Sequence, residues 1–351
     1  MSISCTPMDT PAAWRGDQGI DPEQYLFTLA PAALDELEAT ARRFLTDGPD
    51  LGAVRREDYP LPECAPTLAA WGEVLDNGLG FIVARGVPVD RLPRDVSGAI
   101  FFLLGLHLGH PMRQNAAGDL LTHVVATTSK DPYDPTVLSS RTTGALTFHS
   151  DSSDVVGLLC LHGAAQGGES LLASGATIYN EFVRRRPDLV PALFEPLHWD
   201  WWKQDFDAPA ATYESPMCCV VDGKIAVYGG SKMVYTAQES YPDVPRLTEQ
   251  QREALALADE IAAEPGVAMV LDFQPGDIQW LSNYAAMHSR RAYVDHAEPE
   301  RRRHLMRMWL RRDDGRPTVP GFGKPVEERG GPTERPTIAA LMLPPMPEAE
   351  A

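Results

Sequence analysis

Short apolar runs, most of them separated by glycine, proline or polar turns, dominate the chain from about residue 145 to residue 312. Runs of about four to eight residues that are bounded in this way are typical of β-strands. Strands are predicted at 79–89, 145–151, 155–163, 169–174, 193–202, 217–230, 267–273, 274–283 and 303–312. Many short strands punctuated by turns favour a sandwich or a barrel.

Helical periodicity marks the flanks of this strand-rich region. Segment 31–48 places apolar residues on one stripe, and Gly48 can end that helix in a left-handed conformation. Thr248 and Gln251 have the spacing of a capping box, which predicts a helix that begins there and extends to about residue 266. Further helices are predicted at 99–110 and 177–189. The predicted fold class is therefore mainly β with flanking helices.

The two ends of the chain differ in composition from its middle. Residues 1–22 are predicted to be loosely ordered, and residues 313–351, rich in proline, glycine and glutamate, are predicted to form a wrapping or mobile tail. Residues 23–312 are predicted to form a single domain. Within it, residues 131–144 are predicted to form a long loop of the kind that often serves as a lid.

Composition narrows the classes of function. The 351 residues carry a formal net charge of −18, and such an acidic surface repels phosphate groups, so neither nucleic acid nor an anionic membrane is expected as a partner. A small-molecule substrate is expected instead, and the sequence is compatible with a homo-oligomer. The five cysteines include no Cys-x-x-Cys pair, the start lacks a signal peptide, and no apolar run could span a bilayer. A cytoplasmic protein is therefore expected.

One histidine–aspartate pair lies at the end of a predicted strand and raises the question of a metal site. His149 and Asp151 lie two residues apart, so they point to the same side of an extended chain. Two other pairs, headed by His198 and His296, have the same spacing, so the pair alone decides little. Together with the remote His288, the first pair supplies the two imidazoles and one carboxylate of the facial triad that non-heme Fe(II) oxygenases use.

The last predicted strand carries two arginines four residues apart. Arg303 and Arg307 share one face with Leu305, and methionines alternate with them on the other face. If the arginine face looks into a barrel, each guanidinium needs an anion, and its planar fork suits a carboxylate. Alternatively, the methionine face packs on the core and the arginines face water, and alternation alone leaves both readings open.

Four motifs in order now resemble a known family. "HSD", "GGES", "PGDIQWLSN" followed by "HSR", and "RRRHLMRMWL" are similar to the taurine dioxygenase/clavaminate synthase-like superfamily, over residues of about 75 to 312. Its members are Fe(II)- and 2-oxoglutarate-dependent oxygenases that consume O2. The resemblance implies a double-stranded β-helix, or jelly roll, and the cofactors Fe(II), 2-oxoglutarate and O2.

The resemblance also implies roles for individual residues. His149, Asp151 and His288 match the catalytic iron ligands. Arg303 matches the arginine that pairs with the distal carboxylate of 2-oxoglutarate. Ser170 falls where the family often has a threonine that contacts the same molecule, and serine keeps the hydroxyl. Halogenases of the superfamily lack the carboxylate ligand, so Asp151 argues against chlorination.

Substrate contacts are implied more loosely. Arg307 matches an arginine that often meets an acidic group of the substrate, and Gln114 and Asn115 lie in a segment close to the first metal strand in the family. Asn283 matches an asparagine near the turn that precedes the distal histidine.

The expected function is oxidation of an unactivated C–H bond of a small, acidic molecule, with release of succinate and CO2. Hydroxylation is the expected outcome, and desaturation or cyclisation would use the same site. Two alternatives stay open: a non-catalytic jelly-roll binding protein, and a zinc-dependent hydrolase that uses the same two histidines and aspartate.

Overall fold

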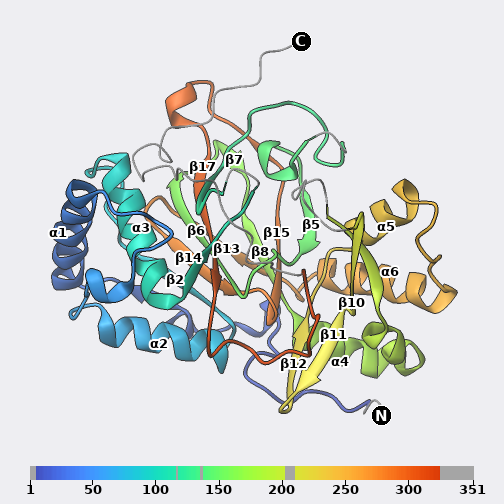
Figure 1. The fold of residues 1–351 in the computed structure, drawn as a ribbon. Coiled ribbons are helices and arrows are strands. Elements are labelled where there is room, and N and C mark those ends of the chain that lie inside the picture. The colour runs from blue at the N-terminus through green and yellow to red at the C-terminus, as the bar shows by residue number, and fades with distance from the viewer. Residues whose placement is uncertain (1–4, 116–117, 135–136, 202–209, 325–351) are drawn as a thin grey trace.

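Two β-sheets lie face to face between two groups of helices in the computed structural model (Figure 1), which describes residues 5–115, 118–134, 137–201 and 210–324. The larger sheet has seven strands, in the order β1-β2-β14-β6-β17-β3, with β4 paired to β17. Their bounds are β1 Leu26–Thr28, β2 Phe81–Arg85, β3 His110–Met112, β4 Leu121–Val124, β6 Val155–His162, β14 Ile278–Ser282 and β17 His304–Arg311. All neighbouring pairs are antiparallel except β1 and β2.

The smaller sheet has the order β13-β8-β15-β5, and every neighbouring pair in it is antiparallel. Its strands are β5 Leu146–His149, β8 Ser170–Ser174, β13 Met269–Leu271 and β15 Ala286–Arg290. Three two-stranded ladders complete the strands: β7 Gln166–Gly167 with β16 Tyr293–Val294, β9 Leu197–Asp200 with β10 Thr212–Ser215, and β11 Cys218–Val221 with β12 Lys224–Val227.

Three helices near the N-terminus cover the outer face of the larger sheet (Figure 1): α1 Pro31–Asp47, α2 Ala65–Asp76 and α3 Arg94–Leu108. α3 is apolar around most of its circumference, as expected for a helix buried between other elements. Met306, Met308 and Leu310 of β17 point into this core. The other three helices lie on the side of the smaller sheet: α4 Gly175–Arg185, α5 Ser231–Ser240 and α6 Glu249–Ala263.

A second core fills the space between the two sheets. Phe81, Leu281 and Trp309 of the larger sheet pack there with Leu172 and Ala286 of the smaller sheet. The larger sheet is therefore apolar on both faces, which explains its nearly continuous apolar strands, as in β6.

Most predicted elements are confirmed, and the exceptions have local causes. The mixed architecture contains more helix than expected, because α2 and α5 were not predicted. Residues 193–194 end a 3-10 helix, Pro187–Phe194, so the predicted strand at 193–202 is reduced to β9. Trp202 of that segment lies outside the described residues.

The prediction of loose order for residues 1–22 does not hold for Trp14. This side chain is 4% exposed and packs against Phe81, and its indole N–H donates to the carbonyl of Leu79 at 2.8 Å. Burial of a large aromatic side chain fixes this part of the segment. Residues 325–351 of the predicted tail lie outside the described residues. Among the helices that are described, each is too short or too polar to pass through a bilayer.

Candidate metal centre

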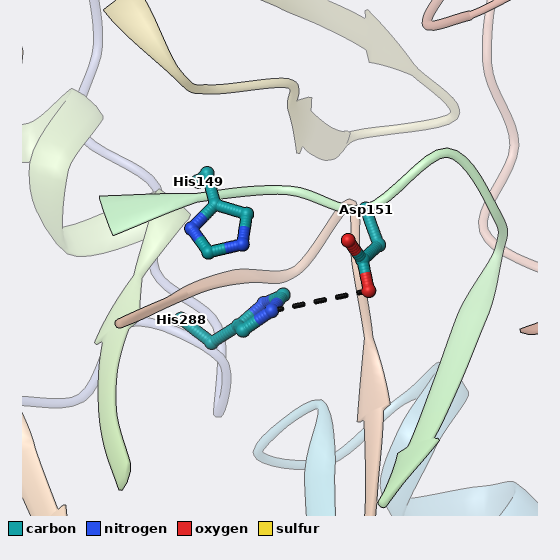
Figure 2. Close-up of side chains that lie close together, drawn as sticks. All are labelled: His149, Asp151 and His288. Carbon is teal, nitrogen blue, oxygen red and sulfur yellow. Dashed lines mark ion pairs between the residues drawn. The ribbon is translucent and has the colours of Figure 1, made fainter. Parts of the chain in front are cut away.

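Two histidines from distant parts of the chain face each other across adjacent strands. His149 is the last residue of β5 and His288 lies in the middle of β15, and the antiparallel register makes their Cα atoms direct partners. Side chains of such partners project to the same face of a sheet, close together. The two ring centroids are 4.3 Å apart, and Figure 2 shows both rings turned toward the same space.

Asp151 completes the group from the turn that follows β5. Asn283 fixes this turn, because its Oδ1 accepts the backbone N–H of Asp151 at 3.2 Å while its Nδ2 donates to the backbone and side chain of Ser153. The Asp151 carboxylate lies 4.0 Å from Nε2 of His288 (Figure 2).

The larger sheet holds the Asp151 carboxylate from its other side. The indole N–H of Trp309 donates to Oδ2 at 2.9 Å, and Nη1 of Arg307 lies 3.3 Å from the same oxygen. Burial alone would raise the pKa of Asp151, but Arg307, the two histidines and the Trp309 hydrogen bond together lower it to about 2. The carboxylate is therefore ionised and oriented.

Each of the two histidines offers a ring nitrogen that can bind a metal ion. Burial and the neighbouring His149 lower the pKa of His288 to about 3, although Asp151 opposes this shift. Nδ1 of His149 hydrogen-bonds with the carbonyl of Thr147 at 2.8 Å, which makes Nδ1 the protonated nitrogen and leaves Nε2 free to bind a metal. The ligand atoms of His149, Asp151 and His288 all lie within 4.8 Å of one another.

This donor set fits a ferrous ion. Two neutral imidazoles and one carboxylate are the ligands that leave open positions on non-heme iron. Among the described residues, no other group of three potential ligands comes together in this way. His198 instead lies on β9, 3.8 Å from Glu214, and so the structure separates the competing His-x-Asp pair from the predicted centre.

Arg303 is buried on the inner side of β17, as the first of the two readings of this strand predicts. It is 4% exposed, and the side chain of Arg307 is 20% exposed, so the reading in which both arginines face water is wrong. Gly168, with φ +77°, leaves room for Arg303, because a Cβ there would lie 3.1 Å from its Nε. Ser170 is also buried, at the start of β8.

Arg307 and Gln114 form one polar group beside Asp151. Nε of Arg307 donates to Oε1 of Gln114 at 2.8 Å, and Thr122 donates to the same oxygen at 2.8 Å. Asn115, in contrast, is exposed and its Nδ2 donates to Asp119 within the β3–β4 connection. The structure thus brings Gln114, but not Asn115, to the metal centre.

Sequence reasoning missed Arg290. This residue follows His288 by two positions on β15, so both side chains project from the same face. Arg290 is 5% exposed and its guanidinium lies 4.9 Å from the ring centre of Tyr293, while that of Arg303 lies 5.2 Å from the same centre. Burial lowers the pKa of Arg290 to about 10. The spacing from His288 is the signal that could have identified it.

Two curated proteins are similar to this chain over most of their lengths. FR-33289 synthase from Streptomyces rubellomurinus is 27% identical over 321 residues, which cover 88% of this chain and 92% of the synthase. Taurine hydroxylase-like protein SAT17 from Stachybotrys chartarum is 29% identical over 305 residues, which cover 84% of this chain and 77% of SAT17.

Solved structures of oxygenases share the fold. Asparagine oxygenase in complex with Fe(II), 3-hydroxyasparagine and succinate superimposes with a TM-score of 0.62 at 20% identity, covering 83% of this chain and 98% of that protein. The non-heme iron oxygenase OrfP in complex with iron and α-ketoglutaric acid gives a TM-score of 0.61 at 16% identity, covering 82% and 94%.

The family described as taurine catabolism dioxygenase TauD, TfdA family matches residues 45–309, which include every residue of the candidate metal centre. On the strength of that match, the chain belongs to the TauD/TfdA family of dioxygenases.

Proposed function

We propose that this protein is an Fe(II)- and 2-oxoglutarate-dependent oxygenase that oxidises an unactivated C–H bond of a small, acidic molecule. Succinate and CO2 are the co-products, and hydroxylation is the proposed outcome. The observation that carries the proposal is the convergence of His149, Asp151 and His288 on one space, with Arg303 buried on the strand that also carries Arg307. The proposed scaffold is a double-stranded β-helix within a single domain of residues 23–312, in a cytoplasmic protein.

Different residues of the chain would bind the metal and the co-substrate. His149, Asp151 and His288 would bind the ferrous ion on one face of its coordination sphere. Bound iron supplies the activation of O2, which is coupled to the oxidative decarboxylation of 2-oxoglutarate. Arg303 and Ser170 would hold the distal carboxylate of 2-oxoglutarate, because a buried guanidinium and a hydroxyl are suitable donors for it.

The position of Arg307 supports the proposal that the substrate is acidic. Its guanidinium lies beside Asp151, and Gln114 anchors it there through Nε. A fixed cation next to the metal can orient an anionic group and so place one C–H bond toward the open coordination positions. Gln114 would help to form this substrate site, and Asn115 would reach it only if the β3–β4 connection moved.

The test is spectroscopic. Purified protein with Fe(II) and 2-oxoglutarate, kept free of O2, is expected to show the weak visible charge-transfer band of the chelate. Asp151→Ala and His288→Ala should remove the band, because each deletes a ligand of the ion. His198→Ala is the matched control, since His198 belongs to the competing pair on β9, and it should leave the band in place.

An unchanged band in both ligand variants would rule out this metal centre. Zinc-dependent turnover without any 2-oxoglutarate band would favour the hydrolase. A succinate-release screen against amino acids, sulfonates and small carboxylates, with the product masses measured, would then identify the substrate.

A further inference from the structure

Two buried guanidinium groups next to Tyr293 lack a carboxylate partner. Arg290 and Arg303 are 5% and 4% exposed, and both contact the ring of Tyr293. A buried cation without a counter-ion is costly, so two of them around one tyrosine ring indicate that an anion belongs close to both.

The hydrogen bonds of both groups are incomplete. Nη2 of Arg290 donates to two backbone carbonyl groups of segment 142–144, whereas its Nε and Nη1 have no partner. Nη2 of Arg303 donates to the carbonyl of Gly168 at 3.3 Å, and its Nη1 has no partner. Asp295 is close enough to act on both cations, but its Oδ1 accepts the backbone N–H of Arg303 at 2.7 Å. Tyr293 is also close enough to act on both cations, but its hydroxyl makes no regular hydrogen bond to either, so three buried donors are left without an anion.

The position of Arg290 matches the far end of a chelating diacid. Arg290 lies on the same face of β15 as His288, about 7 Å farther along the strand. Its cross-strand partner on β8 is Ser170, the residue proposed to contact the distal carboxylate. β15 therefore connects the metal end of the site, at His288, with the carboxylate end, at Arg290. Arg303 contributes from the larger sheet.

We propose that Arg290 is a second binding residue for the distal carboxylate of the co-substrate, so that Arg290 and Arg303 hold this group together. This inference rests on the proposed function. The two arginines would make the site selective for 2-oxo diacids over 2-oxo monoacids. Arg290 also supports segment 142–144 through its other nitrogen, and that contact links co-substrate binding to the chain that leads into β5.

The experiment compares two co-substrates of the same chain length. Fe(II)-loaded protein without O2 is titrated calorimetrically with 2-oxoglutarate and with 2-oxovalerate, which lacks the distal carboxylate. In Arg290→Gln, the amide can still donate to segment 142–144 but the charge is gone. We expect binding of 2-oxoglutarate to weaken by about tenfold to one hundredfold, while binding of 2-oxovalerate is unchanged. Arg291→Gln, at the exposed neighbouring position, should bind both acids as the wild type does.

Equal weakening for both acids would show that Arg290 only positions the loop, and would overturn the inference, as would unchanged binding of both. Arg290→Lys keeps the charge but not the planar fork, and it serves if the glutamine variant does not fold. We expect a smaller loss there, again confined to 2-oxoglutarate, and no loss would count against the inference. A wild-type protein that binds neither acid, or does not discriminate between them, would instead overturn the proposed function itself.

Discussion

Asp151 is held in one orientation by side chains from separate parts of the chain. Asn283 binds its backbone, Trp309 donates to its carboxylate, and Arg307 lies against the same group. Partners that orient a metal ligand usually matter almost as much as the ligand itself. The carboxylate is therefore preorganised for an ion by the chain alone.

At Arg303, binding and stability should respond in opposite ways. Arg303→Ala removes a buried cation that has no carboxylate partner, so the Tm should change little or rise. The affinity for 2-oxoglutarate should fall about a hundredfold, because the distal carboxylate loses a charged partner. Thermal melting and anaerobic titration measure the two quantities. Arg301→Ala, whose side chain is 61% exposed, is the control. Equal 2-oxoglutarate affinity in Arg303→Ala would contradict its role.

The residues of the candidate metal centre could be predicted because their motifs are ordered along the chain, whereas Arg290 could be identified only from its spacing to His288 on a strand that the sequence did not predict. In "HSRR" two arginines are adjacent, and alternation assigns one of them to the interior only when the strand is known. β15 itself gave no clear strand pattern, because its residues mix alanine, methionine, histidine and arginine. The direction of Arg307 toward Gln114 depends on a contact between residues 193 positions apart, which spacing along the chain does not reveal.

Among the elements, α6 and α1 have end signals that could be identified in the sequence. α6 begins with the predicted capping box, in which Thr248 accepts from the N–H of Gln251 and Gln251 accepts from that of Thr248. α1 ends at Gly48 in the left-handed conformation, as expected. α2 and α5, which were not predicted, begin without a side-chain cap hydrogen bond, and burial of their apolar residues stabilises them.

The N-terminal cap of α6 is expected to contribute measurably to the stability of the protein. Thr248→Ala leaves one N–H of the first turn without its side-chain acceptor, and the free energy of unfolding should fall by about 1 kcal/mol. Urea denaturation measures the change. Gln250→Ala, at an exposed position of the same turn, should have little effect. If Thr248→Ala were as stable as the wild type, the cap would not contribute to folding.

For the whole molecule, the arrangement of layers places the polar site between two sheets that are otherwise packed with apolar side chains. Helices α1–α3 complete one core and the contacts between the sheets form another. This burial affects titration beyond the metal centre. The pKa of His304, on the outer face of β17 next to His123, is lowered to about 3, mainly by burial.

Acid should therefore destabilise the metal-free protein. His288 and His304 have pKa values of about 3 when folded and about 6.5 when unfolded, so the unfolded chain binds more protons between these values. The free energy of unfolding should fall by about 2 kcal/mol for each histidine from pH 7.5 to pH 5.0. Urea denaturation at both pH values, with a chelator present, measures this loss.

His304→Gln should have a smaller loss than the wild type over this range. His110→Gln, whose side chain is 57% exposed, is the control and should behave as the wild type does. An equal loss in His304→Gln would show that His304 does not contribute.

The register between β5 and β15 has a further consequence for folding. His149 and His288 face one another only in this alignment, and a slip by one residue would turn one imidazole to the opposite side of the sheet. A ferrous ion can thus bind tightly only to correctly aligned chains, and by mass action it stabilises them alone. Iron binding would in this way favour chains with the correct strand alignment before any catalysis begins.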